Sequence, residues 1–259
     1  MQHHPISFAE YRAIDAVSNS ALKHIDRSAR HMLNAQQYPM ETTDAMRFGT
    51  LVDHLLFGTE CQYVVSPYDD FRTKEAKEWK LEHTHAGVAI FKPDKMKEAE
   101  NLAYALKHHP DVAEILKTGR SQVAVVREIE GVKVKGLFDW MPDETLAIAD
   151  LKTTEDASED AFQRHALNMG YHAQQALYHD LWAAETDEDA HMLWIVGETG
   201  MPHEVAVYRC MDDMLELGRQ LYRRRLARFR EALESGIWQG YPQGIQPMHL
   251  PAWAVPKER

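Results

Sequence analysis

The chain has 259 residues, of which 44% are hydrophobic and 27% are charged, a composition typical of one large globular domain. The formal net charge of −11 argues against a protein that coats nucleic acid by electrostatic attraction over its whole surface. The only cysteines, Cys61 and Cys210, lie far apart, which excludes a cysteine zinc site or a four-cysteine iron–sulfur cluster within the chain and predicts no disulfide framework.

Helices are predicted over the first 117 residues, from apolar side chains at helical spacing and from residues that start or end helices. Ser18 can serve as an N-cap, Gly58 can end a helix, and Pro110 can break one. The predicted helices cover residues 18–34, 45–58, a part of 67–92 around FRTKEAKEWK, and 93–117 on both sides of the proline.

The pattern then changes to short β-prone runs separated by turn signals. Three strands are predicted over residues 122–130, 132–140 and 145–153, and two more within 190–208. Helical spacing returns over 159–184 and 211–235, and the tail over 236–256 is predicted to be an ordered, irregular wrap.

These elements predict an α+β, α/β/α-like fold in which helices flank one central mixed β-sheet that contains an antiparallel meander. We expect a single domain over 1–259, with a helical N-terminal part to about residue 118 and a core from about residue 119.

Two aspartates and a lysine stand on adjacent strands of the predicted meander. Asp139 ends the second strand, and Asp150 and Lys152 lie on the third. Because side chains alternate along a strand, Asp150 and Lys152 share one face, and antiparallel pairing can bring Asp139 beside them.

Carboxylates placed together favour a hard divalent cation such as Mg²⁺ or Mn²⁺, for which the carbonyl oxygen of Leu151 is a further ligand. Such a cation activates water toward a phosphodiester, and Lys152 can stabilise the developing charge. A D-x-K triplet alone is more often a surface ion pair on a solvated strand, and what favours the site is its setting: an upstream aspartate at a strand end and the apolar run LAIAD that leads into it.

Several segments together resemble the PD-(D/E)XK nuclease superfamily, and more closely the RecE-type (exodeoxyribonuclease VIII) exonucleases of phages and prophages. The segments are SNSALKHIDRSARHM, FGTLVDHLLF, FRTKEAKEW, GLFDW, IADLKTT, NMGYHAQQALYHD and WQGYPQGIQPMHLPAW. The resemblance implies a PD-(D/E)XK fold with catalytic Asp139, Asp150 and Lys152.

The resemblance also implies that His54 is a metal ligand and that Gln174 and Tyr178 form a QxxxY motif on the helix after the active-site strands. The chain departs from the family at Gln122, where many relatives have a glutamate that can join the metal shell. It departs again before Asp139, where relatives often have an arginine.

DNA contacts are predicted for Trp140, which adjoins Asp139, and for Arg219, Arg223 and Arg224 on the last helix. The alternative for these arginines is a solvated helix face paired with nearby glutamates.

The leading expectation is an exonuclease that degrades one strand of linear double-stranded DNA from its ends, 5′ to 3′ by resemblance. The resemblance further implies a ring-shaped homo-oligomer and a single-strand annealing protein as a functional partner in phage-type recombination. An endonuclease or Cas4-like nuclease, or a catalytically silent DNA-binding or scaffold protein, remain alternatives. The N-terminus shows no signal peptide and no apolar run reaches the ~18 residues of a membrane span, so we expect a cytoplasmic protein without membrane contact.

Overall fold

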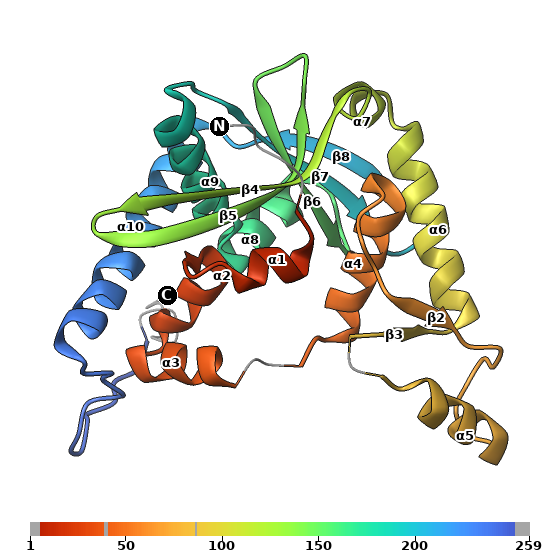
Figure 1. Ribbon diagram of the computed structural model, residues 1–259, viewed down its shortest axis with the longest axis horizontal. Coiled ribbons are helices and arrows are strands. Elements are labelled where there is room, and N and C mark those ends of the chain that lie inside the picture. The colour runs from red at the N-terminus through yellow and green to blue at the C-terminus, as the bar shows by residue number, and fades with distance from the viewer. Residues whose placement is uncertain (1–5, 39–40, 86, 252–259) are drawn as a thin grey trace, which may run out of the picture.

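Helices cover both faces of one mixed β-sheet in the computed structural model, which describes residues 6–38, 41–85 and 87–251 (Figure 1). This arrangement confirms the predicted α+β fold with α/β/α-like layers.

The N-terminal part of the chain is helical and holds three very short strands. Its elements are α1 (Phe8–Ala13), β1 (Val17–Ser18), α2 (Asn19–Leu22), the 3₁₀ helix η1 (Lys23–Asp26), α3 (Ala29–Gln37), α4 (Asp44–Phe57), β2 (Tyr63–Val65), α5 (Lys74–His83), β3 (Ala89–Phe91), α6 (Pro93–His108) and α7 (Pro110–Ile115). As predicted, α4 ends at Gly58, which has a φ of 72°, and the chain breaks between α6 and α7 just before Pro110.

The helix predicted over 18–34 is instead the series α2, η1 and α3. Ser18 caps α2 as expected, but Ser28 caps a new helix by accepting a hydrogen bond from the backbone N–H of His31. The extended backbone of Ser28 ends the first helical segment, so the second capping serine overrides the continuous pattern.

The rest of the chain forms most of the sheet and the helices of one face. Its elements are β4 (Gly119–Ile129), β5 (Val132–Pro142), β6 (Ala147–Thr154), α8 (Glu159–Met169), α9 (Tyr171–Thr186), β7 (His191–Glu198), β8 (Val205–Arg209) and α10 (Asp212–Ser235). The antiparallel meander of β4, β5 and β6 is confirmed, whereas the helical tract predicted over 159–184 is divided by Gly170, with a φ of 74°.

The sheet order is β1-β5-β6-β7-β8, with β4 on the other edge of β5. β6 and β7 pair in parallel over eight residues, and α8 and α9 connect them. β5 and β6 pair only at Trp140 and Ala149 and diverge from there. This divergence leaves room between two strands for side chains rather than backbone hydrogen bonds.

Two apolar cores pack on opposite faces of the sheet. The larger contains residues of α2, α8, α9 and α10, and the smaller contains residues of α4 and α6. On β6, Ile148 belongs to the first core, while Ala149 and Leu151 belong to the second. α5 projects with β2 and β3 away from the central sheet, at the lower right of Figure 1.

The tail over residues 236–251 has no helix or strand, and the remainder of the predicted wrap lies outside the described residues. Its first part is anchored, since Trp238 packs against Phe229 and the carbonyl of Gln239 accepts a hydrogen bond from Arg30. Ile245 and Met248, further along, are fully exposed. Among the helices of the described ranges, none combines the length and hydropathy of a bilayer span.

Candidate active site

Asp139 and Asp150 meet where β5 and β6 diverge. The pairing of Trp140 with Ala149 places Asp139 next to Asp150 in register. Where β5 and β6 separate, the backbone N–H of Leu151 donates to Oδ2 of Asp139 at 3.0 Å. The carboxylate of Asp139 therefore substitutes for a backbone acceptor and is fixed beside Asp150.

Lys152 forms an ion pair with Asp150 through its ammonium group and Oδ2 of the carboxylate. Asp150 is 1% exposed, so this pair lies inside the protein. Burial would lower the pKa of Lys152, but Asp150 and Asp139 outweigh it and raise the pKa. The lysine is thus held as a cation beside two carboxyl groups.

α9 supports this cluster from the side of the larger core. The amide of Gln174 donates to Oδ1 of Asp150 at 3.1 Å and to the hydroxyl of Tyr178 at 3.1 Å. The ring of Tyr178 lies against Gly136 of β5, where a Cβ atom would come within 2.9 Å of the ring. The glycine lets the helix approach the sheet closely enough for Gln174 to reach the aspartate.

α4 contributes Asp53, which the sequence analysis did not identify. Burial is the main reason why the pKa of Asp53 rises to about 6, and the charge of Asp150 raises it further. The hydroxyl of Thr59 donates to Oδ2 of Asp53 at 2.6 Å and works in the opposite direction. Burial likewise raises the pKa of Asp139 well above its usual range, with Asp150 and Asp53 adding to the effect.

His54 was the expected metal ligand on this helix, but the structure gives its imidazole other neighbours. Its Nδ1 contacts the carbonyl oxygen of Thr59, and its ring packs edge-on against Tyr63 at a centroid distance of 5.8 Å. Asp150 raises the pKa of Asp53, and Asp53 raises the pKa of Asp139, so the carboxyl group of Asp53 lies within electrostatic range of both. Metal ligation by His54 stays a prediction, and Asp53 is a further candidate on the same helix.

Gln122, where many relatives have a glutamate, lies in β4. The pairs Ser121 with Trp140 and Val123 with Phe138 set Gln122 opposite Asp139. Its φ of 52° interrupts the ladder at this position. A glutamate in this place would add a carboxylate near Asp139, whereas glutamine adds no charge.

The residues of the cluster offer oxygen donors to a divalent cation. Within residues 6–38, 41–85 and 87–251, no group of three His, Cys, Asp or Glu side chains is arranged to hold a metal ion. The neighbouring carboxyl groups of Asp139 and Asp150, with the backbone carbonyl of Leu151 directly after Asp150, are nevertheless the hard oxygen donors that such a cation prefers. The donor set of Asp139, Asp150 and the Leu151 carbonyl suits such a cation, and Asp53 adds a further carboxyl group within electrostatic range.

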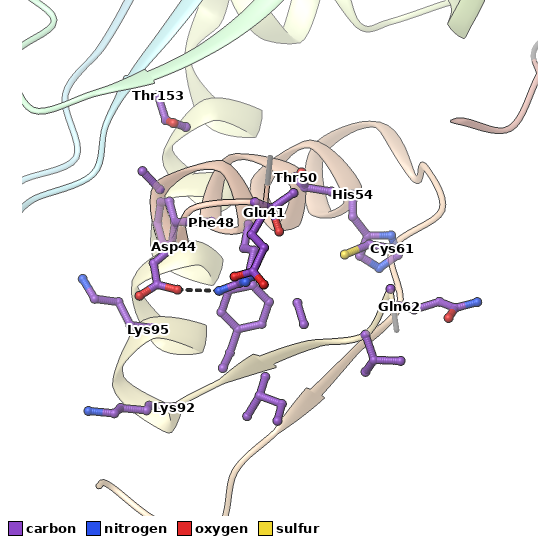
Figure 2. A pocket seen from close by; sticks show the side chains of 18 of the residues that line it. Glu41, Asp44, Phe48, Thr50, His54, Cys61, Gln62, Lys92, Lys95 and Thr153 are labelled. Atoms are coloured by element: carbon purple, nitrogen blue, oxygen red, sulfur yellow. Dashed lines mark hydrogen bonds and ion pairs between the residues drawn. The ribbon is translucent and has the colours of Figure 1, made fainter. Parts of the chain in front are cut away.

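A groove with a volume of about 2170 Å³ begins beside this cluster, at Thr153 and Thr154 of β6. It runs along α4 to β3 and α5, and Figure 2 shows Thr153 and His54 well apart along it, with the imidazole beside Cys61. Cations and acids both line the groove: Arg12, Arg47, Lys80, Lys92 and Lys95 with Glu41, Asp44, Glu60, Asp94, Glu98 and Glu155.

The side chains predicted to contact DNA are engaged within the protein, with one exception. Trp140 stacks on Phe57 at 5.7 Å and donates from Nε1 to the carbonyl of Ile115 at 2.9 Å. Arg219 binds Asp180 of α9 at 2.8 Å, and Arg223 lies 3.6 Å from the same carboxylate. Arg224 is exposed on α10. DNA contact by these residues stays a prediction, and the structure gives three of them a packing role.

The sequence matches a family described as a PDDEXK-like domain of unknown function (DUF3799) over residues 18–248. The chain belongs to this family, which confirms the resemblance to PD-(D/E)XK nucleases that the sequence suggested.

Two solved structures are similar to this chain to different degrees. A protein described as a candidate exonuclease from Eubacterium rectale superposes with a TM-score of 0.68 at 17% identity, over 92% of this chain and 88% of its own. A phage-related exonuclease from Haemophilus somnus 129PT gives a TM-score of 0.36 at 14% identity, over 88% of this chain and all of its own. No curated protein matches the sequence. The Eubacterium rectale structure shares the fold of this chain, and membership of the PDDEXK-like family supports a nuclease.

Proposed function

We propose that this protein is a metal-dependent exonuclease that hydrolyses phosphodiester bonds at the ends of linear double-stranded DNA. The observation that carries the proposal is the cluster of Asp139, Asp150 and Lys152 at the divergence of β5 and β6. Burying two acids and a charged lysine costs free energy unless a ligand offsets the cost. Such a buried cluster is therefore more typical of a catalytic site, here one for phosphodiester hydrolysis, than of a structural core.

Each side chain has a defined part in this proposal. Asp139 and Asp150 would hold Mg²⁺ or Mn²⁺, which when bound neutralises the phosphate and acidifies water. Lys152 orients the attacking water and stabilises the negative charge that develops on the phosphate. Gln174 fixes the direction of the Asp150 carboxylate, and Tyr178 fixes Gln174. Asp53 supplies a third carboxylate to the same place.

The groove beside Thr153 is the proposed path of a DNA strand toward or away from the cluster. It is the large cavity that adjoins the active-site strand, and Phe71 with Lys80 at its far end offers a ring with a cation 4.9 Å above it. Rings and cations together suit the bases and phosphates of a single strand. Polarity, a ring-shaped homo-oligomer and an annealing partner in recombination remain proposals that rest on the family resemblance.

The test is digestion of linear duplex DNA beside a covalently closed circle, with Mg²⁺ or Mn²⁺ and with a chelator as control. We expect loss of the linear DNA alone. Lys152→Ala should lower the rate by a factor of about 10² or more, since it removes charge stabilisation in the transition state. Lys133→Ala is the matched control, because Lys133 is an exposed lysine on β5.

Other outcomes separate the alternatives. Cleavage of the circle would make the protein an endonuclease. No cleavage of either DNA with any divalent metal, although the protein binds DNA, would overturn the proposal in favour of a silent DNA-binding protein. Labelled 5′ and 3′ ends on the linear DNA give the polarity.

A further inference from the structure

Lys152 has a second neighbour besides Asp150. Its Nζ atom lies over the ring of Tyr171, 4.6 Å from the centroid. Tyr171 is the first residue of α9 and follows directly on Gly170, whose left-handed backbone ends α8 and starts the new helix. The turn between the two helices thus delivers an aromatic face to the active-site lysine.

Tyr171 belongs to one stripe of α9 together with the two residues already assigned. Tyr171, Gln174 and Tyr178 are spaced three and seven residues apart, so they share a helix face. Gln174 contacts Asp150, Tyr178 contacts Gln174, and Tyr171 contacts Lys152. The stripe supports the carboxylate and the ammonium of the D-x-K triplet separately.

The separate support of the lysine matters because both oxygens of the Asp150 carboxylate already have partners. One of its oxygens accepts from Gln174 and the other is paired with Lys152. A cation held by Asp150 would compete with Lys152 for this carboxylate, and the ammonium would need another partner to keep its place. An aromatic face attracts an ammonium group without competing for the cation's ligands.

We propose that Tyr171 is a positioning residue, whose ring face holds the ammonium of Lys152 at the reacting phosphate when Asp150 is engaged elsewhere. The proposal rests on the proposed nuclease function for its kinetic consequence, but the contact between ring and ammonium is independent of it. It requires the ring and not the hydroxyl. Tyr171→Phe should therefore behave as the wild type, whereas Tyr171→Leu should not.

Tyr208 provides a matched control. Tyr171 and Tyr208 both pack against Phe162, at centroid distances of 6.5 and 5.5 Å, but only Tyr171 contacts Lys152. Tyr208→Leu therefore removes a comparable aromatic side chain from the same cluster without touching the lysine.

The first experiment is a double-mutant cycle on the metal-free protein, with Tyr171→Leu, Lys152→Met and both together, read by thermal unfolding. We expect the loss in Tm of the double variant to fall short of the sum of the single losses by about 2–4 °C, the size of a partly buried cation–π contact. A cycle with Tyr208→Leu in place of Tyr171→Leu should be additive. Additivity for Tyr171 as well would overturn the contact.

The second experiment measures steady-state cleavage of linear duplex DNA. Tyr171→Leu should lower kcat about 5- to 30-fold with KM unchanged, and Tyr171→Phe should restore it. An unchanged kcat in Tyr171→Leu, or an equal loss in Tyr171→Phe or Tyr208→Leu, would overturn the positioning role. If the wild type itself cleaves no DNA, the proposed function fails, and the thermal cycle still decides whether the ring holds the lysine.

Discussion

The carboxyl group of Asp53 is charged at neutral pH only at a cost to stability. Burial and the neighbouring Asp150 raise its pKa to about 6, whereas the unfolded chain ionises near 4. A raised carboxyl pKa means that the folded state binds the proton more tightly than the unfolded state. This contribution therefore favours the folded protein at low pH and is lost as the pH rises through about 6.

Asp53→Asn should stabilise the metal-free protein at pH 7.5, by about 1–3 kcal/mol, because the amide removes the charge and still accepts from Thr59. The gain should shrink toward pH 4.5, where the wild-type group is protonated. The same substitution should reduce the gain in the free energy of unfolding on adding Mn²⁺. Denaturant unfolding at both pH values, with and without Mn²⁺, measures both effects.

His54→Gln is the matched control for this experiment, since His54 is the adjacent residue on α4. The structure predicts little change in the response to Mn²⁺ for that variant. If His54→Gln abolishes the response and Asp53→Asn does not, the histidine implied by the family resemblance is the ligand and Asp53 is not.

The residues of the site differ in how far the sequence could predict them. Asp150 and Lys152 follow from strand alternation, which is local and holds once β6 is recognised. Asp53 and His54 flank the buried stripe of α4 on opposite sides, about 100° apart. The apolar pattern cannot decide which of the two faces the sheet, because packing sets the rotation of the helix. The contact of Tyr171 with Lys152 could not be predicted from the sequence, because it depends on the turn at Gly170 that directs the ring toward the lysine.

At the scale of elements, the contact between α9 and α10 decides where the supporting stripe lies. A Cβ atom on Gly218 would come within 2.2 Å of the carbonyl oxygen of His172, so the two helices meet backbone to backbone. Arg219, the next residue, binds Asp180 of α9. Burial would raise the pKa of Asp180, but hydrogen bonds from His179, Arg219 and Tyr222 hold it well below its usual range.

Gly218→Ala should therefore destabilise the protein by about 2–4 kcal/mol, although alanine is normally the better helix former by about 1 kcal/mol. The added methyl group pushes α9 away from α10 and shifts Gln174 relative to Asp150, so nuclease activity should fall as well. Gly49→Ala within α4 is the control, because its Cβ would meet only Thr153 Oγ1 at an ordinary 3.6 Å. Thermal unfolding of both variants tests this, and equal stability would contradict the close approach.

The long elements were predictable and the shortest were not. A repeating spacing of apolar residues can be recognised in the long elements, which are α4, α6, α10 and the strands of the meander. The strands β1, β2 and β3 have two or three residues each, which is too short for an alternating pattern. They are defined by their pairing with a partner strand that is distant in the sequence. Two continuous helical patterns were interrupted by single residues, Ser28 and Gly170, whose capping and left-handed conformations outweigh the apolar spacing.

At the scale of the whole molecule, a net charge of −11 means that DNA must be held by a local set of cations. Two surfaces compete for this role. The groove offers Lys80 and Lys92, which lie beyond the active-site strand. The last helix offers Arg224, since Arg219 and Arg223 already face carboxylates.

DNA binding at several salt concentrations, in an Asp150→Ala background that blocks cleavage, distinguishes the two surfaces. Lys92→Gln should weaken binding and reduce the slope of log K against log salt by about 0.7, the value for one lost phosphate contact on a single strand. Arg224→Gln should leave the slope unchanged. The reverse result would place the DNA on α10, as the sequence first suggested, and the groove would lose its proposed part in the path of the strand.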